Sequence, residues 1–210
     1  MTQWIFDLDG TLSNPALGIT RCLNFALKHF GYEPRPFDAL TQFIGPPLEK
    51  AFEALTGTSD ANIILPLVAK YRERYSDVGY AENTLYDGIP QQLAKLQSLG
   101  IDMGVCTSKR VDFAERILKH FGIRDYFRYV SGGDVGIRKG RQLAELLRTG
   151  TISPNAIMIG DRFADIEAAK ENDLESFGVL WGFGSEQELN EAGADRIVTT
   201  VRELLPQNQT

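Results

Sequence analysis

The chain has 210 residues, of which 43% are hydrophobic and 24% are charged. These proportions are ordinary for a soluble globular protein and exclude a disordered or fibrous chain. The formal net charge of −6 and the lack of a basic stripe argue against a protein that binds nucleic acid.

Three further features favour a cytoplasmic protein that contacts no membrane. The longest apolar run, 63–69, is interrupted by Pro66 and is far shorter than the ~20 residues that a membrane span requires. Residues 1–4 carry neither a positive side chain nor a long apolar stretch, so we expect no signal peptide. Cys22 and Cys106 lie far apart in apolar surroundings and are predicted to be buried free thiols, as in a reducing compartment.

The first predicted strand, 4–6, ends directly in Asp7-Leu8-Asp9-Gly10. A buried strand that runs into acidic residues and glycine is typical of a strand edge that opens into a site. A helix follows, with Asn14 as the expected N-cap, Pro15 at its first position and Gly31 at its end. Its predicted apolar face comprises Ile19, Leu23, Ala26, Leu27 and Phe30.

Residues 32–86 keep a helical pattern in which prolines separate short helices, and we expect no strand there. After 87–90 the pattern changes to an alternation of helices and strands. The expected elements are a helix to 99, strand 101–107, helix 111–121, strand 129–130, helix 139–148, strand 156–159, helix 163–172, strand 177–180 and strand 196–198.

This alternation predicts an α/β fold, with a Rossmann-like parallel sheet, right-handed crossovers and helices on both faces. The helical block is then an insertion after the first strand, near the carboxyl ends of the strands, where open α/β sheets have their active sites. We therefore expect a core domain of residues 1–13 and 87–210, and a helical cap domain of residues 14–86 that lies over the site.

Four groups of polar residues fall at the ends of predicted strands or at helix starts: Asp7 with Asp9, Thr107 with Ser108, Lys139, and Asp161 with Asp165. Acidic residues at such positions are costly unless they share a cation or a proton. Asp7, Asp9 and Asp161 together offer the hard oxygen ligands that Mg²⁺ prefers. The Thr107 hydroxyl, a backbone N–H from Ser108 and the Lys139 ammonium supply donors opposite them, which describes a site for a tetrahedral oxyanion.

The charges indicate a mechanism. A carboxylate attacks phosphorus only when the repulsion between the two anions is neutralised, here by Mg²⁺ and Lys139. Asp7 is the expected nucleophile and forms an aspartyl-phosphate, which divides one difficult step into two. Asp9 is placed to protonate the leaving oxygen and then to take a proton from the attacking water, which requires a higher pKa at Asp9 than at Asp7.

The set resembles the haloacid dehalogenase superfamily of phosphotransferases. Asp7-Leu8-Asp9-Gly10-Thr11 matches its first motif, Thr107 its second, Lys139 its third, and the segment 160–165, Gly-Asp-Arg-Phe-Ala-Asp, its fourth. Four motifs in the same order are specific where any one would be weak. Within the superfamily, the segments 43–48 and 86–90 are typical of the phosphoglycolate-phosphatase-like branch.

The resemblance implies a Mg²⁺-dependent phosphomonoester hydrolase that acts on a small phosphorylated metabolite. It implies that the metal ligands are the Asp7 carboxylate, the Asp9 backbone carbonyl and the Asp161 carboxylate, with Asp165 as a further ligand or as a partner of one. The chain departs from many relatives at Gly140, where they have proline after the lysine. We expect a monomer or a weak homodimer.

Two other functions remain as alternatives. Sugar-phosphate mutases of the same superfamily usually carry a His early in the first cap helix and an Arg after the cap-loop glycine, and neither 16–19 nor 45–48 contains these residues. A phospho-acceptor signalling module also combines an Asp nucleophile, acidic metal ligands, a Thr and a Lys. Such modules are roughly half this length, and Asp9 beside the nucleophile would make their phosphorylated state short-lived.

Overall fold

The computed structural model describes residues 3–133 and 138–205, and the chain in it divides into two compact units. One unit comprises Met1–Asn14 and Leu85–Thr210, and the other comprises Pro15–Thr84. Residues 1 and 2, on which part of the signal-peptide expectation rests, lie outside the described residues. Within those residues, no helix combines the length and the apolar character that a membrane crossing demands.

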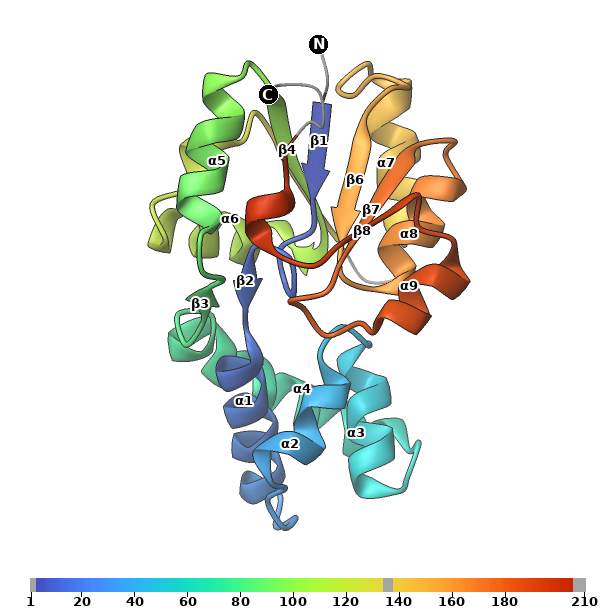
Figure 1. The fold of residues 1–210 in the computed structure, drawn as a ribbon. Coiled ribbons are helices and arrows are strands. Elements are labelled where there is room, and N and C mark those ends of the chain that lie inside the picture. The colour runs from blue at the N-terminus through green and yellow to red at the C-terminus, as the bar shows by residue number, and fades with distance from the viewer. Residues whose placement is uncertain (1–2, 134–137, 206–210) are drawn as a thin grey trace. The chain divides into compact units, whose positions relative to one another are not determined.

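The first unit is built on a parallel sheet of six described strands in the order β5-β4-β1-β6-β7-β8 (Figure 1). The strands are β1 (Gln3–Phe6), β4 (Asp102–Arg110), β5 (Val130–Gly133), β6 (Ile157–Gly160), β7 (Glu175–Val179) and β8 (Arg196–Val198). Each neighbouring pair is parallel. The predicted α/β fold with a parallel sheet is confirmed.

Helices cover both faces of this sheet. The helices α5 (Ile89–Ser98) and α6 (Val111–His120) lie to its left in Figure 1. The helices α7 (Lys139–Arg148), α8 (Phe163–Lys170) and α9 (Glu186–Ala192) lie to its right. Short 3₁₀ turns at Arg124–Tyr126 and Val201–Glu203 complete the unit.

The alternation of side chains along β1 explains why a strand of only four residues anchors the core. Trp4 and Phe6 point to one face, where their rings lie 5.9 Å from that of Phe177 and 6.1 Å from that of Phe127. Ile5 points to the other face and packs in a cluster with Leu143 of α7. A central strand that is apolar on both faces is what a sheet covered on both sides requires.

The order of the strands fixes where a ligand site is expected. From β1 the chain adds β4 and β5 on one side, and β6, β7 and β8 on the other. Open α/β sheets bind ligands beyond the carboxyl ends of the strands at such a reversal. Asp7 directly follows β1 and Asp161 directly follows β6, so both lie at this point.

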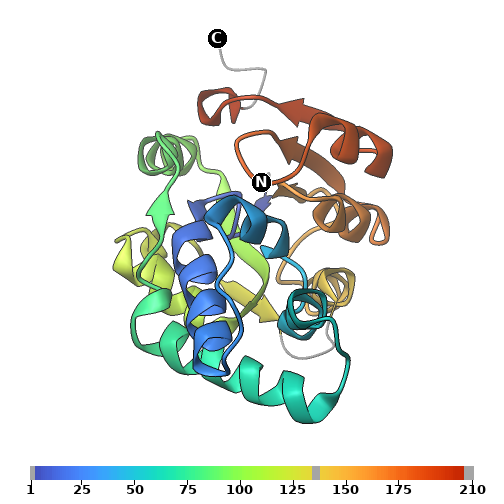
Figure 2. The ribbon, with the colours of Figure 1, turned by 90° about the horizontal axis from the view of Figure 1, so that it is seen from below.

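The second unit is helical, with α1 (Ala16–His29), α2 (Phe37–Leu40), α3 (Leu48–Thr56) and α4 (Ala61–Arg74). A 3₁₀ turn at Thr41–Phe43 and a π-helical turn at Tyr75–Gly79 follow α2 and α4. The helix α4 packs against both α1 and α3 (Figure 2). Apolar side chains of α1 and α4 at helical spacing are fully buried, as amphipathic helices require.

The start and the end of α1 test four predictions. Asn14 is not the N-cap, because it belongs to a two-residue strand, β2 (Ser13–Asn14), and Pro15 takes the cap position with no side-chain bond. Gly31 does end the helix, with a φ of +78° that suits glycine. Phe30 is 42% exposed, so its place on the buried face was wrong, because it lies beyond the last helical residue.

Other boundaries differ for local reasons. A second two-residue strand, β3 (Thr84–Leu85), pairs with β2 inside the segment where no strand was expected. The strand expected at 129–130 lies at Val130–Gly133, because two glycines, which are depleted in strands, hid its continuation. The helix α9 was not predicted at all. Both cysteines are buried thiols that form no disulfide among the described residues, as predicted.

Candidate functional site

Asp7 is the first residue after β1, and the sheet fixes its backbone. Its N–H donates to the carbonyl of Ile159 on β6 at 2.9 Å, so the strand ladder extends to this residue. Its Oδ1 atom accepts a hydrogen bond of 2.7 Å from the N–H of Leu8. The sheet therefore fixes the Asp7 backbone, and the Leu8 N–H orients its carboxylate.

Two further aspartates meet Asp7 from the β6–α8 segment. Asp161 follows β6 and is fully buried, and Asp165 lies in the first turn of α8, also buried. The Oδ2 atom of Asp165 accepts a hydrogen bond of 3.0 Å from the N–H of Arg162, which caps the helix start. One carboxylate oxygen each from Asp7, Asp161 and Asp165 lie within 4.8 Å of one another.

Lys139 supplies the positive charge beside these aspartates. It is the first residue of α7, and only 5% of it is exposed. Its Nζ atom lies 2.9 Å from Asp7 Oδ2 and also pairs with Asp165 Oδ1. Burial lowers the pKa of the ammonium group, but the charges on Asp165 and Asp7 outweigh it, so the pKa rises and the group stays charged.

One ammonium group does not balance three buried carboxylates. Burial raises the pKa of the Asp161 carboxyl, and the negative charges on Asp165 and Asp7 raise it further. A divalent cation would remove this repulsion, and carboxylate oxygens are the ligands that Mg²⁺ prefers. Among the described residues, this cluster is the group of possible ligands whose spacing fits a metal ion.

Asp9 has a partner that the sequence did not reveal. The Nζ atom of Lys109 lies 2.7 Å from Asp9 Oδ2, and the two side chains are 10% and 20% exposed. Asp9 Oδ1 is buried and has no hydrogen-bond partner within the described part of the chain. Burial raises the pKa of the Asp9 carboxyl against the opposing charge of Lys109. A raised pKa agrees with the requirement for a general acid.

The phosphate-binding candidates on β4 differ in exposure. Phe6 pairs with Val105, so Thr107 lies at the same sheet edge as the residues that follow β1. Thr107 is 2% exposed, and its hydroxyl accepts a hydrogen bond of 3.3 Å from the N–H of Lys109. Ser108 is exposed. The pairing register between β4 and β5 shifts between Thr107 and Arg110. Side chains after Thr107 therefore do not alternate regularly between the two faces of the sheet.

A loop after β7 closes around Asp161. The hydroxyl of Thr11 donates to Asp161 Oδ1 at 3.3 Å, and the N–H of Phe183 donates to Asp161 Oδ2 at 2.8 Å. A Cβ atom at Gly10 would collide with the Asp161 carboxylate, and its φ of +84° also favours glycine. The first motif and the loop after β7 therefore hold this carboxylate from two sides.

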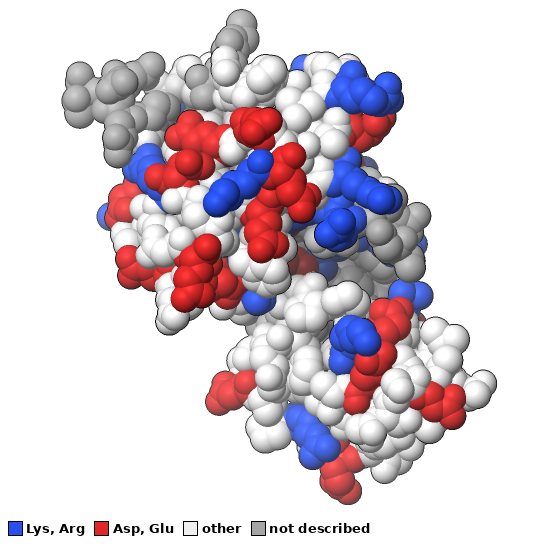
Figure 3. All heavy atoms as spheres, turned by 90° about the vertical axis from the view of Figure 1, so that its right-hand side faces the viewer, with Lys and Arg blue, Asp and Glu red and all other residues white. Residues whose placement is uncertain are grey.

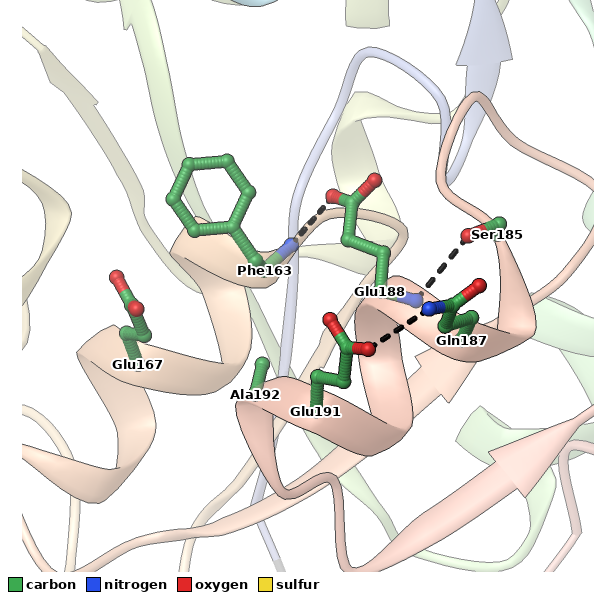
Figure 4. Close-up of a pocket in the computed structure, with 7 residues that line it drawn as sticks. All are labelled: Phe163, Glu167, Ser185, Gln187, Glu188, Glu191 and Ala192. Carbon is green, nitrogen blue, oxygen red and sulfur yellow. Dashed lines mark hydrogen bonds between the residues drawn. The ribbon is translucent and has the colours of Figure 1, made fainter.

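A hollow lies between α8 and α9, and none of these aspartates lines it. Between Phe163 and Asp195 every charged side chain except Lys170 is a carboxylate, and Figure 3 shows many acidic groups on this face. The hollow has a volume of about 380 Å³, and Glu188 and Glu191 line it (Figure 4). Glu188 accepts from the N–H of Phe163 at 2.9 Å and Glu191 from Gln187 at 2.8 Å, so both are already paired.

Comparison with known proteins gives a consistent family. The family model described as haloacid dehalogenase-like hydrolase matches residues 4–179, which include every predicted site residue. The 5′-nucleotidase of Pseudomonas aeruginosa is 39% identical over 191 residues, which are 88% of this chain and 85% of that protein. The phosphoglycolate phosphatase of Colwellia psychrerythraea is 27% identical over 212 residues, 96% of this chain and 94% of that protein.

A relative with a different name and a solved structure complete the comparison. Tyrosine-protein kinase PtkA of Mycobacterium tuberculosis is 34% identical over 184 residues, which are 86% of this chain and 62% of that protein. A haloacid dehalogenase-like family hydrolase from Streptococcus pneumoniae superposes with a TM-score of 0.88 at 28% identity. That superposition covers 97% of this chain and 96% of the other.

Proposed function

This chain belongs to the haloacid dehalogenase-like hydrolases, and from that membership we propose that it is a Mg²⁺-dependent phosphatase that acts through an aspartyl-phosphate at Asp7. One observation carries the proposal. Asp7, Asp161 and Asp165 converge within 4.8 Å of one another, beside the buried ammonium group of Lys139. Buried carboxylates in such number are costly unless a divalent cation joins Lys139 in balancing their charge.

The donor set fits Mg²⁺. The oxygens come from carboxylates alone, without thiolate or imidazole, and this is the chemistry of a hard divalent cation. Asp7 and Asp161 would hold the metal, together with the backbone carbonyl of Asp9. Asp165 already gives both of its oxygens to Lys139 and Arg162, which favours an orienting role for it. When bound, Mg²⁺ would supply the positive charge that offsets repulsion between a carboxylate and a phosphate.

Each residue of the site has a role in the proposed two-step reaction. The Asp7 carboxylate attacks phosphorus and becomes the acyl phosphate, while Lys139 and the Thr107 hydroxyl bind phosphoryl oxygens, with the Ser108 N–H beside them. Asp9 donates its proton to the leaving oxygen. In the second half, Asp9 takes a proton from water, which attacks the acyl phosphate and releases inorganic phosphate and free Asp7.

The proposed substrate is a small phosphorylated metabolite. Relatives named 5′-nucleotidase and phosphoglycolate phosphatase make nucleoside monophosphates and phosphoglycolate the first compounds to compare by kcat/KM. The acidic α8–α9 face supports a protein that does not bind nucleic acid. We propose that it acts in the cytoplasm, away from membranes, as a monomer or weak homodimer.

The alternative of another class is a phospho-acceptor module, which the cluster of Asp7, Asp161 and Asp165 beside Lys139 also fits. That function requires a phosphorylated Asp7 that persists after the donor is removed. The proposed acid–base role of Asp9, next to Asp7, instead supports rapid release of phosphate. A purified protein that keeps its acyl phosphate after gel filtration would support the module and oppose the phosphatase.

Removal of the metal tests the proposal directly. We expect EDTA to abolish hydrolysis of p-nitrophenyl phosphate and Mg²⁺ to restore it, since Lys139 alone does not balance the three carboxylates of the cluster. Mg²⁺ should also stabilise the folded protein, by about 2.7 kcal/mol at roughly a hundred times its Kd. The measurements are a colorimetric assay and a thermal melt at increasing Mg²⁺. Hydrolysis that is indifferent to chelation would remove the metal from the proposal.

Replacement of Asp9 separates the two halves of the reaction. In Asp9→Asn we expect steady-state turnover to fall by roughly 10²–10⁴, because the amide neither donates nor accepts the required proton. With ³²P-labelled p-nitrophenyl phosphate, whose phenolate leaves without a proton, phosphoenzyme should still form. Because its hydrolysis is slow, it should accumulate, as rapid quench measures. Asp112→Asn is the control, because Asp112 forms an exposed ion pair with Arg110. Turnover equal to that of the parent would exclude an acid–base role for Asp9.

A further inference from the structure

We infer that Trp181 is a positioning residue that orients the Asp161 carboxylate through Thr11. Trp181 lies in the loop that follows β7, and its indole N–H donates to the carbonyl of Thr11 at 2.9 Å. Thr11 is fully buried, and its hydroxyl donates to Asp161 Oδ1 at 3.3 Å. The indole is thus the first member of a chain of hydrogen bonds that ends on the carboxylate.

The same loop holds the other oxygen of Asp161. Two residues after Trp181, the N–H of Phe183 donates to Asp161 Oδ2 at 2.8 Å. This bond opposes the rise that burial causes in the pKa of the carboxyl. Trp181 and Phe183 belong to one short loop. The hydrogen bond from the Trp181 indole to the Thr11 carbonyl therefore also fixes the position of the Phe183 N–H.

The glycines of the loop bring its backbone onto Asp161. A Cβ atom at Gly182 would collide with the Asp161 side chain and with the carbonyl of Gly10, and one at Gly184 would collide with the Asp161 carbonyl. No side chain fits between the loop and the aspartate, so the loop touches Asp161 with its backbone. A shift of the loop would therefore move the Phe183 N–H that donates to the Asp161 carboxylate.

These contacts predict a role in metal affinity, and that prediction rests on the proposed Mg²⁺ site. Groups that orient a metal ligand typically change metal affinity by about 10–100-fold when they are removed. Loss of the indole N–H leaves the chemical groups on Asp7 and Asp9 in place. Trp181→Phe should therefore weaken Mg²⁺ binding while kcat at saturating Mg²⁺ stays close to that of the parent.

The second tryptophan of the chain provides a matched control. The chain has 2 tryptophans, and the other, Trp4, lies in the core at 2% exposure. Its indole N–H has no hydrogen-bond partner among the residues that the structure describes. Trp4→Phe removes an indole without removing such a bond, and it leaves Trp181 as the sole tryptophan fluorophore, whose emission should follow a Mg²⁺ titration.

The test is calorimetric titration of Mg²⁺ into the substrate-free protein, with a thermal melt and a near-ultraviolet dichroism spectrum of each variant. We expect Trp4→Phe to bind like the parent and Trp181→Phe to bind about tenfold more weakly. Thr11→Val, which removes only the hydroxyl of the chain of bonds, should weaken binding similarly, and the double variant should be no weaker than either.

The possible results separate this inference from the proposed function. Parent-like Mg²⁺ affinity in Trp181→Phe overturns the inference and leaves the metal site intact. Independent, additive losses in the double variant exclude an action through Thr11. A parent protein that binds no Mg²⁺ overturns the metal site and, with it, the role of Trp181. If Trp181→Phe does not fold, Thr11→Val with parent-like affinity still overturns the inference.

Discussion

Asp7→Asn is expected to abolish phosphate ester hydrolysis, with kcat lower by roughly 10⁴-fold or more, as loss of an enzyme nucleophile typically causes. The amide oxygen still accepts the N–H of Leu8, so the strand end keeps its local hydrogen bond. The change also removes one of three crowded negative charges, while Asp165 continues to pair with Lys139. The fold should therefore survive, with a melting midpoint close to that of the parent.

The control for this prediction is the neighbouring aspartate. After a quench with ³²P-labelled substrate, Asp7→Asn should carry no label, whereas Asp9→Asn should accumulate it. Both variants are neutral amides two residues apart, so a general loss of charge in the site does not explain a difference between them. Turnover in Asp7→Asn above about 1% of the parent, in protein free of contaminating phosphatase, would contradict the assignment of the nucleophile.

The core of the fold was predictable because its elements carry strong local signals. The helix expected at 139–148 is α7, residue for residue, and the strand expected at 196–198 is β8. In contrast, α9 was missed although Ser185 and Glu188 have the spacing of a capped helix start, and the Ser185 hydroxyl accepts the N–H of Glu188. The helix has only seven residues, too short for its apolar periodicity to be recognised.

The convergence of the site was predictable for a topological reason. The carboxyl ends of neighbouring parallel strands meet at one edge, so Asp7 after β1 and Asp161 after β6 must be close once both strands are recognised. Lys139 joins them because it begins the helix that precedes β6. The structure places all three in one buried cluster. The catalytic roles of Asp7 and Lys139 remain predictions, which the substitutions at these two residues test.

Lys109 and Trp181 were not predicted because they depend on side-chain direction and on contacts that are distant in sequence. Lys109 lies where the ladder of β4 becomes irregular, so alternation along the strand does not say which way it points. Trp181 contacts Thr11 across 170 positions. The sequence does show an unusual segment after the buried strand β7, in which two aromatic residues alternate with two glycines over 181–184. It does not show that this loop contacts Asp161.

Lys139→Met is expected to have the largest effect on stability. The substitution keeps the length of the side chain but removes the positive charge between Asp7 and Asp165, with Asp161 close by. Removing one partner of a buried ion pair costs about 3–5 kcal/mol, because the remaining charge is left without compensation. Urea denaturation should show this loss, whereas Lys170→Met, which removes an exposed ammonium bonded to the Ala192 carbonyl, should cost little.

Two rescues distinguish lost charge balance from lost packing. Mg²⁺ should stabilise Lys139→Met more than it stabilises the parent, because the ion then faces carboxylates that have no other cation. Adding Asp165→Asn should recover part of the lost stability, because the carboxylate stranded by the first change becomes neutral. Neither rescue should restore turnover, since the phosphate then lacks the Lys139 ammonium. Lys139→Met within about 1 kcal/mol of the parent in urea would show that the cluster does not need this cation.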